Sequence, residues 1–96
     1  MKPSIEQITE LQKEHGLEEL QGYINNGMAW QLEGHVGRTA MQALESGACM
    51  LPEERHNDYY GNTVPSRNDL KSGTKGTLEN SQNFWEQVLE GEIEMY

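Results

Sequence analysis

Two short amphipathic stretches open the chain. Their apolar positions recur every three or four residues, which is typical of surface helices: Ile5, Ile8, Leu11, Leu17, Leu20, Tyr23 and Ile24. Ser4 and Gln7 have the spacing of a capping box, in which each side chain accepts a hydrogen bond from the other residue's backbone N–H. Gly16 and the run of Asn25, Asn26 and Gly27 are suited to end the two helices that this pattern predicts.

A longer pattern predicts a third helix over residues 28–45. Its apolar positions lie mostly four apart: Met28, Leu32, Val36 and Ala40, widened by Ala29, Ala43 and Leu44. Gly34 and Gly37 fall inside it, and a glycine costs up to about 1 kcal/mol relative to alanine in a helix interior. The two glycines either permit close helix approach or divide the segment into two helices. Gly47 suits the C-terminal end.

The last helix is expected to begin at a cap formed by Thr77 or Asn80 and to run to Leu89. One face carries its apolar and small residues: Leu78, Ser81, Trp85, Val88 and Leu89. Gly91 is suited to end it, and residues 92–96 are expected to form a frayed acidic tail.

Three large aromatic side chains are candidates for the hydrophobic core. Trp30 and Trp85 stand at helical spacing and are expected inside it, where each buries a large apolar area. Phe84 adjoins Trp85, so one of the two points away from the main apolar face. Phe84 either packs beneath the preceding loop or forms an exposed aromatic patch, and packing is the favoured interpretation.

Residues 51–76 combine turn-forming residues with large apolar ones. Proline, glycine, asparagine, aspartate and serine recur without helical or strand periodicity. The stretch also holds side chains that a solvated linker does not need: Tyr59, Tyr60, Val64 and Leu70. So long a connection is uncommon in a compact domain unless it binds something or is disordered. We expect an ordered irregular loop with a functional role, containing a short hairpin over residues 59–64 that turns at Gly61 and Asn62.

Together these elements predict a mainly α fold, a small bundle of three to four short helices with the long ordered loop at residues 51–76. Ninety-six residues suit one small domain, so residues 1–96 are expected to form a single unit. Hydrophobic residues make up only 34% of the chain, which implies a small core. The oligomeric state stays open between a monomer with a small core and a homo-oligomer whose subunits share a core.

The net charge of −9 is unevenly distributed. Residues 1–50 have a balance of −4, residues 51–76 are neutral, and residues 77–96 have a balance of −5. Direct nucleic-acid binding requires clustered lysine and arginine, so this charge excludes it as a general function. A DNA-binding helix-turn-helix over residues 4–45 is excluded for the same reason, since Arg38 is the only positively charged residue of its recognition helix. Acidity fits a basic protein partner or simple solubility.

The loop carries candidate binding residues in two polar segments. Arg55 and His56 precede Asp58 in the first, and Arg67 precedes Asp69 in the second. Arginine makes fork-shaped hydrogen bonds to a carboxylate or a phosphate, which would bind a ligand. It can equally bind the loop to itself, and this interpretation is favoured because an ordered loop must satisfy its backbone groups.

A possible anion site precedes the last helix. Gly73, Thr74, Lys75 and Gly76 could gather backbone N–H groups and a positive charge at the helix N-terminus. The glycine and lysine spacing departs from that of a phosphate-binding P-loop. A turn followed by a helix cap is the favoured interpretation.

Nothing in the sequence points to catalysis, a metal or a cofactor. The histidines His15, His35 and His56 lie far apart and lack the pairing of a zinc site. Cys49 stands between Ala48 and Met50, as a small buried hydrophobe does, rather than as a nucleophile for His56. We therefore expect a non-enzymatic protein without cofactors.

The same sequence features favour a soluble cytoplasmic protein with no membrane association. One cysteine cannot form an intramolecular disulfide, which suits a reducing compartment. The N-terminus lacks the apolar core of a signal peptide, and no stretch approaches the ~18 apolar residues of a membrane span.

Three segments, residues 47–52, 58–67 and 70–77, resemble small uncharacterised proteins of bacteria and of their phages or other mobile elements. The resemblance covers roughly the central third of the chain. It implies a bacterial or phage cytoplasmic context, in which small acidic proteins often bind a host or phage protein. No activity and no site residue come with it.

Three functions are therefore weighed. The first is a protein-interaction module whose loop presents Tyr59, Tyr60, Arg67 and Lys71 to a protein partner. The second is an acidic nucleic-acid mimic that occupies a basic DNA- or RNA-binding protein. The third is a small anion-binding domain or enzyme that uses His56, Arg67 and Lys75. Salt separates the first two, because mimicry weakens steeply as ionic strength rises.

Overall fold

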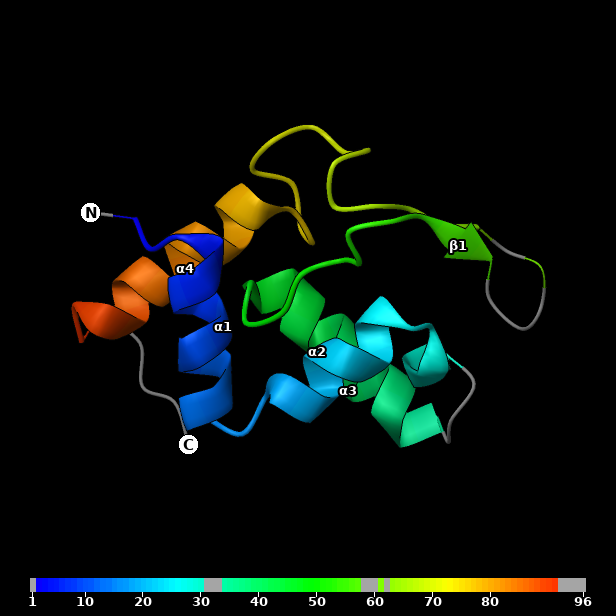
Figure 1. Ribbon diagram of the computed structural model, residues 1–96, viewed down its shortest axis with the longest axis horizontal. Helices are drawn as coiled ribbons and strands as arrows, with labels where there is room; N and C mark the ends of the chain where they lie inside the picture. The colour runs from blue at the N-terminus through cyan, green and yellow to red at the C-terminus, as the bar shows by residue number, and fades with distance from the viewer. Residues whose placement is uncertain (1, 31–33, 58–60, 62, 92–96) are drawn as a thin grey trace.

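The computed structural model describes residues 2–30, 34–57, 61 and 63–91, and it is mainly helical as the sequence predicts. In chain order the elements are α1 (Ile5–Glu14), α2 (Glu18–Asn25), the 3-10 helix η1 (Met28–Trp30), α3 (Gly34–Ser46), β1 (His56–Asn57), β2 (Thr63–Val64) and α4 (Leu78–Leu89). Figure 1 shows α1 and α4 together at one end of the longest axis and β1 at the other. Between them, α2 packs against α1 and α3, and α3 also packs against α4.

The helix ends follow the local signals in the sequence. The Ser4 N–H donates to Gln7 Oε1 at 2.7 Å and the Gln7 N–H to Ser4 Oγ at 3.2 Å, so the predicted capping box is confirmed. Gly16 follows α1 with a φ of 74°, the left-handed conformation that glycine adopts without strain. Of the two caps considered for α4, Thr77 is the one used, because its Oγ1 accepts from the Asn80 N–H at 3.3 Å.

The predicted third helix is interrupted. Met28–Trp30 forms a short 3-10 helix and α3 begins only at Gly34, so of the two possibilities left open the division into two helices is correct. A Cβ placed on Gly37 would lie 3.6 Å from the carbonyl oxygen of Ala29, which shows how closely η1 rests on α3. Residue 32, expected on the same apolar stripe, lies outside the described residues.

The aromatic core forms around α4. Trp85 is fully buried and Phe84 is buried beside it in an edge-to-face contact, with ring centroids 5.1 Å apart. The packing interpretation of Phe84 is thus confirmed. Leu89, however, is 59% exposed, so its predicted place on the buried face is wrong. With both aromatic residues buried, that face is centred near Ser81, and at 3.6 residues per turn Leu89 lies about 90° from its centre.

Two buried glutamines fix the chain between α3 and the loop. Gln12 Nε2 donates to Gln21 Oε1 and to the carbonyl oxygen of Ala48, both at 2.9 Å. Gln21 bonds both backbone groups of Met50: its Oε1 accepts from the N–H and its Nε2 donates to the carbonyl, each at 2.8 Å. The Ala48 carbonyl also accepts from Trp85 Nε1 at 3.3 Å. These polar side chains therefore satisfy a buried stretch of backbone that has no strand partner.

A hairpin forms in the loop, though not with the predicted strands. His56 pairs with Val64 and Asn57 with Thr63 in an antiparallel ladder, so the first strand lies three residues before the expected one. Gly61, at a φ of 81°, lies in the connection as expected. Tyr59, Tyr60 and Asn62 lie outside the described residues, as does the tail at residues 92–96.

Candidate functional site

The two polar segments of the loop are tied to each other. Arg55 makes a fork to Asp69, with Nε 3.1 Å from Oδ2 and Nη2 2.9 Å from Oδ1. The Asp69 carboxylate also accepts from the Ser66 N–H at 2.9 Å, and Ser66 Oγ donates to the Glu53 carbonyl at 2.6 Å. The bond from Arg55, with that from Ser66, holds the pKa of Asp69 below its usual value. Polar contacts within the loop thus order it.

Arg67 points into the protein rather than toward a partner. Its Nε donates to the Leu51 carbonyl at 2.7 Å, and its backbone N–H donates to the Pro52 carbonyl at 2.9 Å. The guanidinium is half-buried, and its burial lowers the pKa of Arg67. Leu51 also donates its N–H to the carbonyl of Gly76 at 2.9 Å, so both ends of the loop meet at this residue.

We expect Arg67→Ala to lower the free energy of unfolding by about 2 kcal/mol, because it leaves the part-buried Leu51 carbonyl without its charged donor. Thermal and urea unfolding followed by circular dichroism measure the change. Lys71→Ala removes the same charge from an exposed position in the same loop and serves as the control. Equal stability of the two variants would contradict a structural role for the arginine.

Backbone hydrogen bonds shape the segment of the predicted anion cradle into turns. The Thr74 N–H donates to the Lys71 carbonyl at 3.0 Å, and the Thr77 N–H donates to the Thr74 carbonyl at 3.1 Å. Thr77 Oγ1 donates to that same carbonyl at 2.6 Å. Gly73 and Gly76 both have positive φ, as successive turns require. The segment is built as a turn that leads into a helix cap.

A carboxylate lies beside the predicted anion cradle. Glu79, in the first turn of α4, accepts a hydrogen bond from Ser72 Oγ, and its carboxylate lies 3.8 Å from Lys2 Nζ. Lys75, by contrast, is exposed. Negative charge near a helix N-terminus is stabilising, so Glu79 favours the start of α4.

A groove runs between α3 and the loop, and we call it the hairpin groove. Its volume is about 340 Å³ and its walls are mostly apolar: Trp30, Met41 and Leu44 on the helical side, and Leu51, Val64 and Pro65 on the loop side. Glu45 and Lys75 are its charged residues. Met41 is 48% exposed, and Trp30 is half-buried. The prediction that Trp30 lies in the core is thus correct only in part, because one side of the ring packs on the core and another lines the groove.

The structure does not bring the predicted site residues together. Of the anion-site residues, Lys75 and Gly76 line the hairpin groove. Arg67 lines a smaller polar recess with Glu79, and Tyr59 and Tyr60 fall in the part of the chain that is not described. Sequence reasoning missed Met41. The available signal was that an apolar residue stood off the Val36, Ala40 and Leu44 stripe, on a face expected to be polar.

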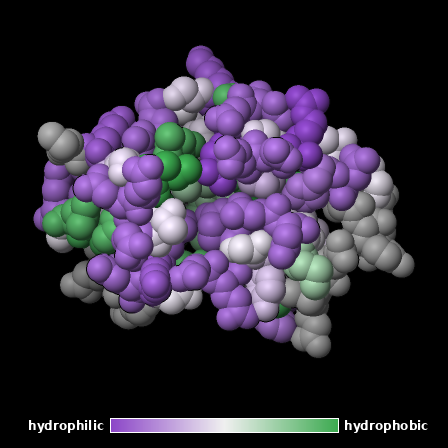
Figure 2. All heavy atoms as spheres, in the orientation of Figure 1, coloured by the Kyte–Doolittle hydropathy of each residue, from purple (hydrophilic) through white to green (hydrophobic). Residues whose placement is uncertain are grey.

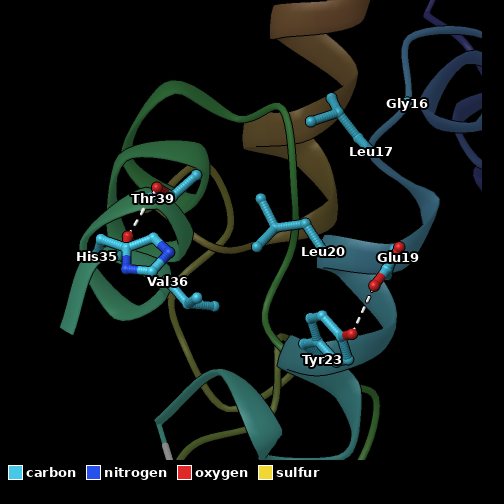
Figure 3. A pocket seen from close by; sticks show the side chains of 8 residues that line it. All are labelled: Gly16, Leu17, Glu19, Leu20, Tyr23, His35, Val36 and Thr39. Atoms are coloured by element: carbon cyan, nitrogen blue, oxygen red, sulfur yellow. Dashed lines mark hydrogen bonds between the residues drawn. The ribbon is translucent and has the colours of Figure 1, made fainter. Parts of the chain in front are cut away.

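A second groove, of about 360 Å³, lies between α2 and α3 (Figure 3). Leu17 and Leu20 line it from the α2 side and Val36 lines it from α3, together with polar side chains of both helices. Tyr23 donates to the Glu19 carboxylate, and this bond raises the pKa of the tyrosine. The surroundings are those of an ordinary helix–helix boundary, without convergent polar groups.

Cys49 and His56, two of the residues considered for catalysis, pack against other parts of the fold. Burial raises the pKa of the Cys49 thiol to about 12, so it stays protonated and weakly nucleophilic at neutral pH. His56 lies on β1 and rests on Gly27, where an added Cβ would be 2.9 Å from its Nε2. Within the described residues no three histidine, cysteine or carboxylate side chains gather as metal ligands. None of the helices in that part is long and apolar enough to cross a membrane.

Comparison with known proteins gives one family. Neither the curated proteins nor the solved structures yield a significant match. The model of DUF7417, a domain of unknown function, matches residues 5–63, which run from the first residue of α1 to the first of β2. Because the match spans more than half of the sequence, the chain belongs to the DUF7417 family.

Proposed function

We propose that this protein is a non-enzymatic protein-interaction module that binds a protein partner through the loop at residues 51–76. The hairpin groove is the observation that carries the proposal. It joins the loop to α3, its walls are mostly apolar, and it opens to solvent beside the exposed side chain of Met41. An exposed apolar surface with a few charged residues at its edge is typical of protein-binding sites.

The residue types of the groove support a protein rather than a small ionic ligand. Tryptophan and methionine are enriched in protein interfaces, and the flexible methionine adapts to the shape of a partner. Thr63 lines the groove and follows closely after Tyr59 and Tyr60 in the sequence. Tyrosines commonly anchor interfaces, so the proposal includes both of them. Lys71 is exposed on the same loop, and the proposal includes it as well.

The proposed context is a phage or mobile element in a bacterial cytoplasm. It rests on the resemblance of residues 47–52, 58–67 and 70–77, and on a single cysteine that is buried and unpaired. The family adds no activity, because its domain is one of unknown function.

The test is capture of partners from a bacterial lysate on the immobilised full chain, with matched variants. Met41→Glu places a charge in the hairpin groove, and Met28→Glu makes the same change at an exposed methionine outside it. We expect a specific protein to bind the wild type and Met28→Glu, to remain bound at high salt, and to be lost from Met41→Glu. Identical capture by both variants would exclude the groove.

The tyrosines are tested separately. Changing both Tyr59 and Tyr60 to serine is expected to abolish capture of the same protein while helicity, measured by circular dichroism, stays unchanged. Retained capture would remove the tyrosines from the interface and leave the groove as its only part.

An acidic nucleic-acid mimic is the second candidate. Its support is the exposed glutamates on the outer faces of α1 and α2: Glu6, Glu10, Glu14, Glu18 and Glu19. A partner held by these charges would be a basic nucleic-acid-binding protein, and modest salt would release it. The anion-binding alternative has less support, because Glu79 lies at the N-terminus of α4 and Arg67 is bonded within the loop.

A further inference from the structure

A third groove lies between α1 and the last turn of α4, at the opposite end of the molecule from the hairpin (Figure 1). We call it the α1–α4 groove. Its volume is about 350 Å³, and Leu11 and Leu89 form its apolar floor. Leu89 has 59% of its side chain exposed, and Figure 2 shows apolar surface over this end of α4.

The wall that α1 contributes is uniformly negative. Glu6, Glu10 and Glu14 lie four residues apart, so they share one face of the helix over two turns, about 12 Å. Across the described ranges no ion pair involves any of the three. Like charges at this spacing destabilise a helix, so the stripe works against the stability of α1. The C-terminus of α4 adds its partial negative charge at the same end.

We propose that the α1–α4 groove binds a basic amphipathic helix of a partner protein. Apolar side chains of that helix would cover Leu11 and Leu89, and lysines or arginines one turn apart would reach the glutamates on α1. Charge complementarity and apolar burial then act at the same place, as in other helix-in-groove complexes. The proposal involves none of the loop residues, so it stands or fails independently of the proposed function.

The charge of the groove disfavours the other occupants. A second copy of the chain would bring a net charge of −9 toward the three glutamates. The chain's own residues 92–96 follow α4 directly, but they include Glu92 and Glu94 and would bring like charge to the same wall. A cationic helix with an apolar stripe would relieve the repulsion among the glutamates of α1 and would cover Leu89.

The experiment titrates the full chain, by calorimetry at low and at high salt, with a synthetic helical peptide that has leucines on one face and lysines beside them. Glu10→Gln with Glu14→Gln removes two charges inside the groove. Glu18→Gln with Glu54→Gln removes two exposed charges outside it and is the matched control. Leu89→Ser tests the apolar floor of the groove, and Met28→Ser is its control at an exposed residue outside both this groove and the hairpin groove.

We expect the groove double variant to weaken binding about five-fold or more and the control double variant less than two-fold. Leu89→Ser should weaken binding several-fold, and Met28→Ser should leave it unchanged. Equal loss in both double variants would mean general charge attraction and overturn the proposal, as would an unaffected Leu89→Ser. Dimerisation that Leu89→Ser abolishes would assign the groove to a second copy, and tighter peptide binding after deletion of residues 92–96 would assign it to the tail; either result overturns the proposal.

Discussion

Replacing Gly47 with alanine is expected to lower the free energy of unfolding by about 3–4 kcal/mol. Gly47 follows α3 with a φ of 102°, a left-handed conformation that strains any residue with a Cβ. The new Cβ would also lie 2.7 Å from the Asn80 carbonyl oxygen and 2.8 Å from Phe84 Cβ. Both neighbours are fixed parts of α4, so relief requires the helix to move away from α3.

Gly16→Ala separates the two contributions. Gly16 also has a positive φ, of 74°, but an added Cβ there would meet nothing within 4 Å. In this variant the free energy of unfolding should fall by about 1–2 kcal/mol, the cost of backbone strain without a steric clash. Urea unfolding followed by tryptophan fluorescence gives both values. If the two variants lose the same stability, the close approach of α4 to Gly47 has no energetic weight.

Replacing Gln21 with alanine is the second large effect, a loss of about 3 kcal/mol. The change leaves the buried N–H and carbonyl of Met50 without partners and opens a space in the core. A buried backbone group without a hydrogen bond retains the full cost of its desolvation. Chemical unfolding of the purified variant measures the loss.

Gln42→Ala is the matched control for Gln21, since Gln42 is exposed in the middle of α3. Its stability should stay within about 0.5 kcal/mol of the wild type. The double variant of Gln12 and Gln21 should lose less than the sum of the two single variants, because the two side chains share a hydrogen bond. Additive losses would show that the two glutamines act separately.

The helices were predictable because their signals are local. The Ser4 cap, the Thr77 cap and the glycines after α1 and α3 each act within a few residues, and the structure uses all of them. Gly34 and Gly37 indicated that residues 28–45 could divide, but both lie within α3, so they did not give the position of the division.

The contacts made across the chain were not predictable. Arginine and aspartate were expected to order the loop, but the sequence did not indicate that Arg55 pairs with Asp69, 14 residues away. Gln12 and Gln21 appear polar in sequence and are buried, because only the folded chain brings the backbone of Ala48 and Met50 to them. Leu89 is the opposite case, an apolar residue whose helix extends past its cover.

Only one side of the candidate site was predictable from the sequence. Sequence composition marked residues 51–76 as functional, and one side of the hairpin groove comes from them. The other side includes Trp30, which was expected in the core, and Met41, which lies on a helix face that was expected to be polar. A groove depends on which elements lie opposite each other, and hydrophobic periodicity carries no such information.

The segment that matches the family model leaves out part of the buried core. The match ends at Thr63, whereas Trp85, the largest fully buried side chain, lies 22 residues further on and donates to the carbonyl of Ala48. Asp69 and Arg67, which hold the loop, also lie beyond it. A fragment cut at the family boundary would therefore have an open core and an untethered loop, and the natural length for a minimal version of this protein extends through α4.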